Sequence, residues 1–431
     1  MGVVSCGTTM LDQGVFNNIG AVTWDTTAKT SGFTAVSGNG YFVNTTSASI
    51  TVTLPSSPAA GAIVGIKDYA NTADTNKIII ARNGSNIQGT ADDFDIVTEG
   101  GSVLLVYVDG TQGWKVTSAS QASDITNAAF ISATGGTITT DGDYKVHTFT
   151  GPGTFTVSSV GNPIGSDSVD YLVVAGGGGT GYGGGGAGGF REGYNPGSYT
   201  ASPLATSALP VSATGYPITV GGGGSAGPSG GGSDDGGGNS GSNSVFSTIT
   251  SAGGGGGGGK NPPGPNAGKS GGSGGGATFD GSQPAGGAGN TPPVSPPQGN
   301  NGGGAPGGAA QVSGGGGGAT QVGETIAGQG KGGDGGDGAG TAINPGAGTP
   351  GPNGSLRYFS GGGAGGANTP GGTPGPASGG VGGGGSNPGA DSHNGSSGTA
   401  NTGGGASGKE AEGSNGAAGG SGIVIIRYKF Q

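Results

Sequence analysis

Glycine is the residue that most constrains what this chain can fold into, because it has no Cβ atom and loses more conformational entropy on ordering than any other residue. The chain contains 431 residues, of which 116 are glycine. Residues 1–150 hold 18 of these glycines, which leaves 98 in the 281 residues that follow, or about one residue in three. The main boundary in the chain is therefore expected near residue 150.

The glycine-poor part has the pattern of an all-β module. Apolar residues alternate with Thr and Ser in "SITVTLPSS", which is typical of a half-buried strand that stops at Pro55. Further strands are expected in "GAIVGIKDYA", "NKIIIARNG", "SVLLVYVDG" and "TQGWKVTS". Asn83-Gly84 and Asp109-Gly110 are expected to supply the positive φ angles of tight turns. The spacing predicts an antiparallel, β-sandwich-like module.

A second group of strands brackets the glycine-rich region. "YKVHTF" and "TFTV" are expected to pair through a turn at "TGPG", and "VDYLVVA" then runs into glycine after residue 175. At the far end of the chain, "GIVIIRYKF" is entered from glycine. If these last two strands lie side by side and antiparallel, both glycine ends leave the same edge of one small sheet. The bracketing strands, about 137–175 and 421–430, are then a clamp that holds the glycine between them.

Polyglycine can adopt the extended left-handed helix with three residues per turn that proline also prefers. Without Cβ atoms, neighbouring runs can approach closely enough for backbone N–H and C=O groups to pair. We expect a packed bundle of this polyglycine II type, since pure glycine runs alternate with turns rich in proline and charge is low. A flexible linker is the alternative, and collagen is excluded because glycine does not recur at every third position.

These patterns predict an all-β chain with four parts. They are an attachment leader (1–37), an antiparallel β module (38–118), a linker (119–130), and a glycine-rich domain with bracketing strands (131–431).

Composition excludes several classes of function. Only 14 Lys and Arg residues are spread over a chain with a net charge of −10, which argues against nucleic-acid binding. The apolar runs are too short to span a membrane. Glycine-rich sequence produces nucleotide-loop patterns by chance, so no cofactor is expected. "GGDGGDG" resembles a calcium-binding repeat but is not iterated, and we expect no specific metal at Asp334 and Asp337. His147 is expected to be a structural surface residue on a strand, and no catalytic set is indicated.

The sequence resembles bacteriophage tail fibres and adhesins with a C-terminal glycine-rich domain. "SVDYLVVAGGGG", recurrent GGGG runs and a chain that closes on "GGSGIVIIRY" carry this resemblance. The segment from "GYFVNTTSASITVTLPSS" to "LLVYVDGTQGWKV" is similar to β-modules in tail fibres of marine phages, especially those that infect cyanobacteria. The resemblance implies a non-enzymatic virion protein, a homotrimer that binds other tail proteins through its N-terminal region. It also implies that glycine-rich loops contact a polysaccharide or outer-membrane protein of the host.

The candidate contacts are the rare aromatic and cationic residues within the glycine field, because aromatic side chains give large contact area at low entropic cost. An equally open alternative is that they plug the edge of the glycine bundle or its trimer contacts. A non-adhesive virion component, such as a capsid decoration or fibre connector, is the alternative function. The candidates are Tyr182, Phe190, Arg191 and Tyr194 in one group, and Arg357, Tyr358 and Phe359 in another.

Overall fold

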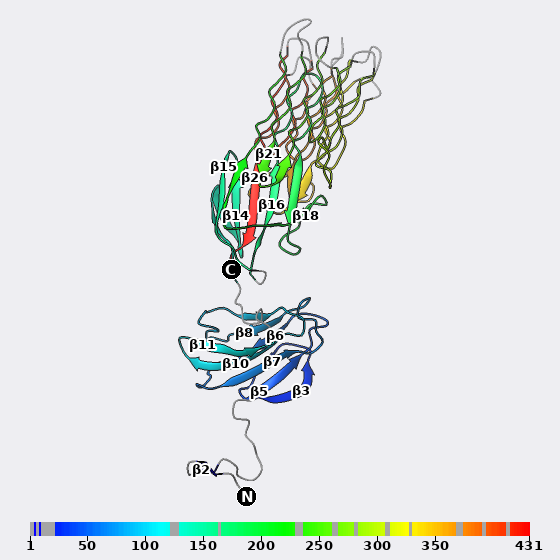
Figure 1. The fold of residues 1–431 in the computed structure, drawn as a ribbon. Helices are drawn as coiled ribbons and strands as arrows, with labels where there is room; N and C mark the ends of the chain where they lie inside the picture. Colours follow the sequence, from blue (N-terminus) through cyan, green and yellow to red (C-terminus); the bar gives the residue numbers. More distant parts are fainter. Residues whose placement is uncertain are drawn as a thin grey trace. The chain divides into compact units, whose positions relative to one another are not determined.

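The structure is a computed structural model of the chain, and it is all-β, as predicted (Figure 1). No helix occurs among the residues that it describes. These are 4–5, 8–9, 22–120, 129–162, 165–228, 236–260, 266–279, 283–306, 311–326, 330–367, 374–389, 394–410 and 414–431. The chain divides into two compact units, residues 1–129 with 162–165, and residues 130–161 with 166–431. Most of the expected linker and much of the expected leader lie outside the described residues.

The N-terminal unit is a sandwich of two sheets. A short pair, β1 (Val4–Ser5) and β2 (Thr8–Thr9), precedes them. One apolar cluster takes side chains from both sheets, including Val43 and Val64 from the first and Val52 and Ile80 from the second. The five-stranded sheet runs in the order β11 (Gly113–Ala119), β10 (Ser102–Asp109), β7 (Ile63–Asp68), β5 (Asn39–Val43), β3 (Thr23–Lys29). The four-stranded sheet runs in the order β4 (Phe33–Thr34), β6 (Ile50–Thr53), β8 (Ile78–Ala81), β9 (Phe94–Ile96).

Strand pairing in this unit is mixed, which corrects the expectation of a purely antiparallel module. β3, β5 and β7 pair in parallel, as do β4, β6 and β8. From β3 to β8 the chain enters the two sheets alternately, so neighbours within a sheet are two strands apart in sequence and run in the same direction. Asn83-Gly84 has the expected positive φ angles, whereas the later turn places its positive φ at Gly113 rather than at Asp109-Gly110.

The glycine-rich unit also begins as a sandwich. Its larger sheet runs in the order β13 (Thr137–Asp141), β14 (Tyr144–Phe149), β26 (Ile423–Lys429), β16 (Ser168–Val174), β17 (Phe190–Tyr194), β18 (Thr206–Ser207), and β19 (Leu209–Pro210) also pairs with β16. The second sheet runs in the order β12 (Ser132–Thr134), β15 (Gly153–Ser159), β20 (Gly215–Thr219), β21 (Ser244–Phe246), β22 (Ile249–Ser251). A small sheet of β23 (Ala339–Thr341), β25 (Arg357–Phe359) and β24 (Thr349–Pro350) completes the unit.

β16 is buried on both faces, which explains its continuous apolar sequence. Val169 and Val173 point into a core shared with the second sheet, whereas Leu172 and Val174 point into a core on the opposite face. The expected pairing of "YKVHTF" with "TFTV" is wrong. β14 has β13 and β26 as neighbours, and the turn at 150–152 carries the chain across the sandwich into the other sheet.

The clamp is confirmed. β16 and β26 are antiparallel neighbours, and Val174 lies opposite Ile423. Glycine therefore leaves one strand and enters the other at the same edge of the sheet, and the runs between residues 175 and 422 extend from that edge (Figure 1). We call this block of runs the glycine slab.

Backbone hydrogen bonds in the glycine slab follow a period of three residues, as polyglycine II requires. Run 183–189 shows the pattern, because each third amide points to the same neighbouring run. The amides of Gly183, Gly186 and Gly189 bond to the carbonyls of Gly258, Gly255 and Ala252, those of Gly184 and Ala187 to Gly314 and Gly317, and those of Gly185 and Gly188 to Ala406 and Gly403. Three neighbours thus hold one run, and the block is cross-linked in two dimensions.

Candidate interaction site in the glycine-rich unit

The structure brings one residue from each predicted contact group into a single core. Phe190 on β17 and Phe359 on β25 are both buried, and both belong to the apolar cluster on the face of the larger sheet. A third predicted contact, Tyr182, is also buried but lies outside this cluster. These three rings therefore pack inside the chain, which is the plugging role considered above.

The other four predicted contacts are partly exposed beside this core. The Arg357 Nε atom donates to the carbonyl of Ala347 at 3.2 Å. The ring of Tyr358 lies against Gly340 and Gly351, where a Cβ atom would collide with it. Tyr194 packs edge to face on Tyr199, with the ring centroids 5.8 Å apart. Arg191, also on β17, is half-buried like Tyr194.

Tyr182 stands at the turn of the first glycine hairpin, between outgoing run 176–181 and returning run 183–189. Residues 176–190 are all buried, so this hairpin is the centre of the slab. It turns after about seven residues, and large side chains gather around this turn.

We call the side chains around this turn the plug: Tyr182, Phe279, Lys260 and Lys409. The Tyr182 and Phe279 rings meet edge to face with centroids 5.9 Å apart. The Lys409 Nζ atom lies 4.8 Å from the Tyr182 centroid, and the Lys260 Nζ atom lies 5.5 Å from the Phe279 centroid. Cations over ring faces are attracted by the ring quadrupole, and more strongly when desolvated, as Lys409 is at 2% exposure.

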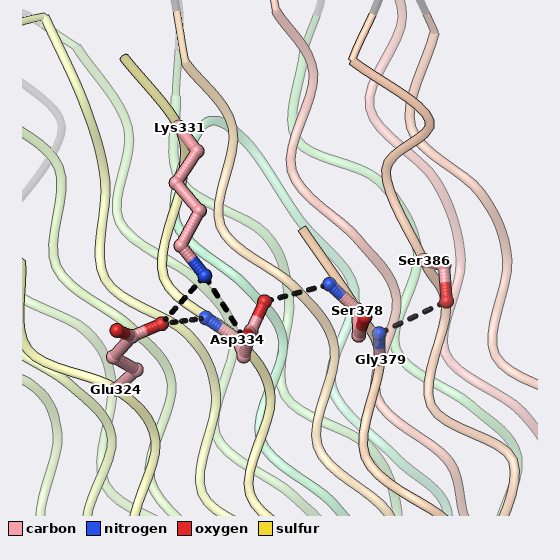
Figure 2. A network of polar contacts seen from close by, with 6 residues as sticks. All are labelled: Glu324, Lys331, Asp334, Ser378, Gly379 and Ser386. Atoms are coloured by element: carbon pink, nitrogen blue, oxygen red, sulfur yellow. Dashed lines mark hydrogen bonds and ion pairs between the residues drawn. The ribbon is translucent and has the colours of Figure 1, made fainter. Parts of the chain in front are cut away.

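The "GGDGGDG" motif caps backbone amides of a neighbouring run. The Asp334 carboxylate accepts the amide of Ser378 at 2.7 Å (Figure 2). The Asp337 carboxylate accepts the amide of Val381 at 2.9 Å. Donors and acceptors are both three residues apart, which matches the period of the helices. The motif therefore links its own run to the run that contains Ser378 and Val381 through two hydrogen bonds.

Asp334 also anchors a surface network. Its own amide donates to Glu324 Oε2 at 2.8 Å, and Lys331 Nζ lies 2.9 Å from Asp334 and 3.3 Å from Glu324 (Figure 2). The hydrogen bond to Asp334 raises the pKa of Lys331. The carboxylates of Asp334 and Glu324 thus both accept hydrogen bonds or ion pairs from groups of the protein. Among the described residues, no group of three potential ligands is arranged to hold a metal ion. Asp234 and Asp235, in a second acidic motif, lie outside those residues.

Two buried carboxylates, which the sequence analysis did not single out, tie the larger sheet to its flanking loops. Glu192 accepts hydrogen bonds from the Tyr199 hydroxyl at 3.0 Å, the Ser202 amide at 2.9 Å and the Thr341 hydroxyl at 2.5 Å. Asp170 accepts from the Asn195 amide at 2.7 Å. Burial raises the pKa of Glu192, and it raises that of Asp170 to about 6. Each is only 1% exposed, so these groups belong to the interior rather than to an exposed surface.

His147 lies on a strand, β14, as expected, but it is fully buried rather than on the surface. Its Nδ1 atom is 2.8 Å from the carbonyl of Gly135, and its Nε2 atom is 3.2 Å from the Tyr428 hydroxyl. Burial lowers the pKa of His147, which favours the neutral ring. A charge here would be desolvated between two sheets.

Comparison with known proteins identifies the glycine-rich unit. The family model described as a glycine-rich domain matches residues 148–429, well over half of the chain. A search of curated proteins gives no significant match. No helix of the described residues is long and apolar enough to cross a membrane. The matched span begins in β14 and ends in β26, so it contains the clamp and the whole slab. The chain therefore belongs to the glycine-rich domain family.

Proposed function

We propose that this protein is a structural virion protein of a bacteriophage tail fibre, and that its glycine slab presents loops to the host surface for recognition and adsorption. The observation that carries the proposal is the cross-linked slab anchored on one sheet edge. Its runs extend from that edge, and backbone hydrogen bonds hold each run to its neighbours. A block of this kind holds the segments at its far end at fixed spacing.

Loops that are ordered before they contact the host bind more favourably than flexible loops. Association is weakened by the entropy of ordering loops and side chains, and loops held by a stiff base avoid much of that cost. The slab supplies stiffness through backbone pairing alone, so glycine is scaffold and the residues that interrupt it are free to determine specificity. The partly exposed residues Arg191, Tyr194, Arg357 and Tyr358 remain candidate contacts at the sheet end of the slab.

The partners follow from this role. The ligand would be a polysaccharide or an outer-membrane protein of the host cell. The N-terminal region would bind other tail proteins, and the chain would assemble as a homotrimer in the host cytoplasm, to be released in virions by lysis. No cofactor, nucleic acid, membrane insertion or catalytic step is part of the proposal.

The test is adsorption to cells. Fluorescently labelled protein is mixed with marine cyanobacterial strains, and bound label is measured by flow cytometry with and without competing unlabelled protein. We expect saturable binding to a subset of strains and blocked phage adsorption to those strains. Replacing residues 261–265, "NPPGP", with Gly and Ser of the same length should reduce binding, whereas Tyr69→Ser in the N-terminal unit should not.

Immunogold labelling of virions decides between this function and a non-adhesive virion part. Label at the fibre tip supports the adhesin. Label on the capsid or in the middle of a fibre, together with no binding to any strain that the phage infects, would refute it.

A further inference from the structure

A groove lies on the outer face of the five-stranded sheet in the N-terminal unit, far from the glycine slab in sequence. Its volume is about 470 Å³, within the range of small-ligand sites. Along β5 and β7, inward residues such as Tyr41 and Ile66 alternate with Phe42 and Lys67, which line the groove. The lining residues that carry the argument are Trp24, Phe42, Lys67, Ser102, Leu104 and Ser118.

Two glycines on β5 and β7 leave room for the Trp24 ring to lie against the sheet. Gly40 and Gly65 are register partners on β5 and β7. A Cβ atom at Gly40 would come within 2.7 Å of the Trp24 ring, and one at Gly65 within 2.9 Å of the Val22 side chain. Glycine inside a strand is destabilising relative to alanine, because it loses more backbone entropy on folding. Two adjacent glycines therefore weaken the sheet at the one place where the indole lies on it.

Trp24 remains accessible in this position. It is 42% exposed, in contrast to Trp114, which is fully buried. The Phe42 ring lies beside it, with centroids 5.0 Å apart and planes tilted by 37°. The two rings form an angled aromatic surface. Large exposed aromatic surface on a sheet that already has a packed core on its other face is typical of a binding site.

Polar groups complete the lining. The Lys67 ammonium donates to the carbonyl of Gly100, which fixes the cation at the groove and leaves two protons for other acceptors. Ser102 and Ser118 add hydroxyl groups. A ligand that fits must have one apolar face for the rings and several hydroxyl or carboxylate groups around its edge.

We propose that this groove binds a saccharide unit. A pyranose ring has this chemistry, since one face exposes C–H groups and the rim carries hydroxyls. A nucleic acid fits less well, because a single lysine cannot neutralise a run of phosphates. An apolar peptide would bury the serine hydroxyls and the two remaining ammonium protons of Lys67 without giving them acceptors. The groove lies in the N-terminal unit and shares no residue with the slab, so the inference is independent of the proposed adhesive role of the slab.

Tryptophan fluorescence of the full chain tests the proposal, because one of the two tryptophans is accessible and the other is not. Acrylamide should quench Trp24 alone. The probes are maltohexaose, cellohexaose, chitohexaose and a hexamer of alginate. At least one should protect Trp24 from quenching in a saturable manner. If Trp24 is not quenched in free protein, or if no probe protects it, the proposal is wrong.

Three variants test whether saccharide binding depends on the groove itself. Affinity electrophoresis through gels containing the protecting saccharide should show binding weakened by about tenfold or more for Trp24→Ala, as expected for loss of a central aromatic anchor. Ser118→Leu narrows the groove from an exposed position and should also weaken binding, even if Trp24→Ala fails to fold. Tyr69→Ala, at an exposed ring that does not line the groove, should bind as wild type. Equal loss for all three variants would show that binding does not depend on the groove, and a lower molar mass for Trp24→Ala by light scattering would mark the face as a contact between copies. Either result would overturn the proposal.

Discussion

Replacing one interior glycine with alanine should destabilise the slab out of proportion to the single methyl group that it adds. Gly185 lies in the central hairpin, where its amide donates to the Ala406 carbonyl at 2.8 Å. A Cβ atom on Gly185 would collide with the carbonyl oxygen of Gly178, the atom that accepts the Ala406 amide at 3.1 Å. The backbone angles of Gly185 do not fall in the left-handed region, so the obstacle is the close approach of chains.

The loss of stability expected for Gly185→Ala can be estimated from the hydrogen bonds around Gly178. To make room, the run that contains Gly178 must retreat by on the order of an ångström in a close-packed interior. That shift breaks the bond from Ala406 and strains the 2.8 Å bond from the Gly178 amide to the Gly186 carbonyl. A buried donor or acceptor left unpaired costs about 1–3 kcal/mol. Two affected bonds give about 2–5 kcal/mol, which corresponds to roughly 5–15 °C in the melting temperature of a unit of this size.

Gly222 provides the matched control. It lies in another run of the slab, it is exposed, and a Cβ atom there would meet nothing within 4 Å. Gly222→Ala should be neutral or should stabilise by about 0.4–1 kcal/mol, because alanine reduces the entropy of the unfolded chain. Scanning calorimetry measures both variants, and hydrogen exchange shows whether amides near Gly178 lose protection. If Gly185→Ala melts and exchanges like wild type, the slab is not held by close backbone contact as described here.

Three further predictions concern side chains. Since the pKa of Asp170 rises from 3.8 to about 6 on folding, its contribution to stability should be fully present below about pH 4 and should be lost, by up to about 3 kcal/mol, as the pH rises through 6. Asp170→Asn should flatten that part of the calorimetric pH profile, and identical profiles for the two proteins would contradict this. Asp334→Ala should raise the hydrogen-exchange rate of the Ser378 amide by about tenfold, with a smaller rise for Asp334→Asn, which keeps an acceptor. Tyr182→Ala should lower the stability of the glycine-rich unit by about 3–5 kcal/mol through the cavity that it leaves in the plug, and an unchanged melting temperature would refute the filling role.

The strands could be predicted well from the sequence, because the alternation of apolar and polar residues in a strand can be read within a few neighbouring positions. The clamp was also predictable, since β16 and β26 each meet glycine at one end. The partners of each strand were harder to predict. "TGPG" has the composition of a hairpin turn, yet both neighbours of β14 are strands other than β15, and the turn crosses between sheets. The parallel pairs of the N-terminal unit likewise arise from the route of the chain between two sheets, which no single strand encodes.

The candidate contacts show a second feature that is hard to predict from the sequence, which is whether a rare aromatic side chain is buried or exposed. Rare aromatic residues in a glycine-rich region suggest surface contacts, but interior positions of the unit also need large side chains, because glycine has none with which to fill space. Tyr182 serves that need at the central hairpin, and Phe190 and Phe359 serve it at the sheet. The spacing of Asp334 and Asp337 did contain a usable signal. A separation of three residues equals the helical period, so both carboxylates meet the same neighbouring run.

The three-residue period of the slab also governs how such a protein can change in length. Adding one triplet to each arm of a hairpin extends it by one helical turn, about 9 Å, and returns every later amide to its former partner. Adding one or two residues rotates everything beyond the insertion by a third or two thirds of a turn, and its amides then face the wrong neighbours. Insertions and deletions among relatives should therefore fall in multiples of three within the runs, so that reach evolves in discrete steps while the connecting segments vary freely.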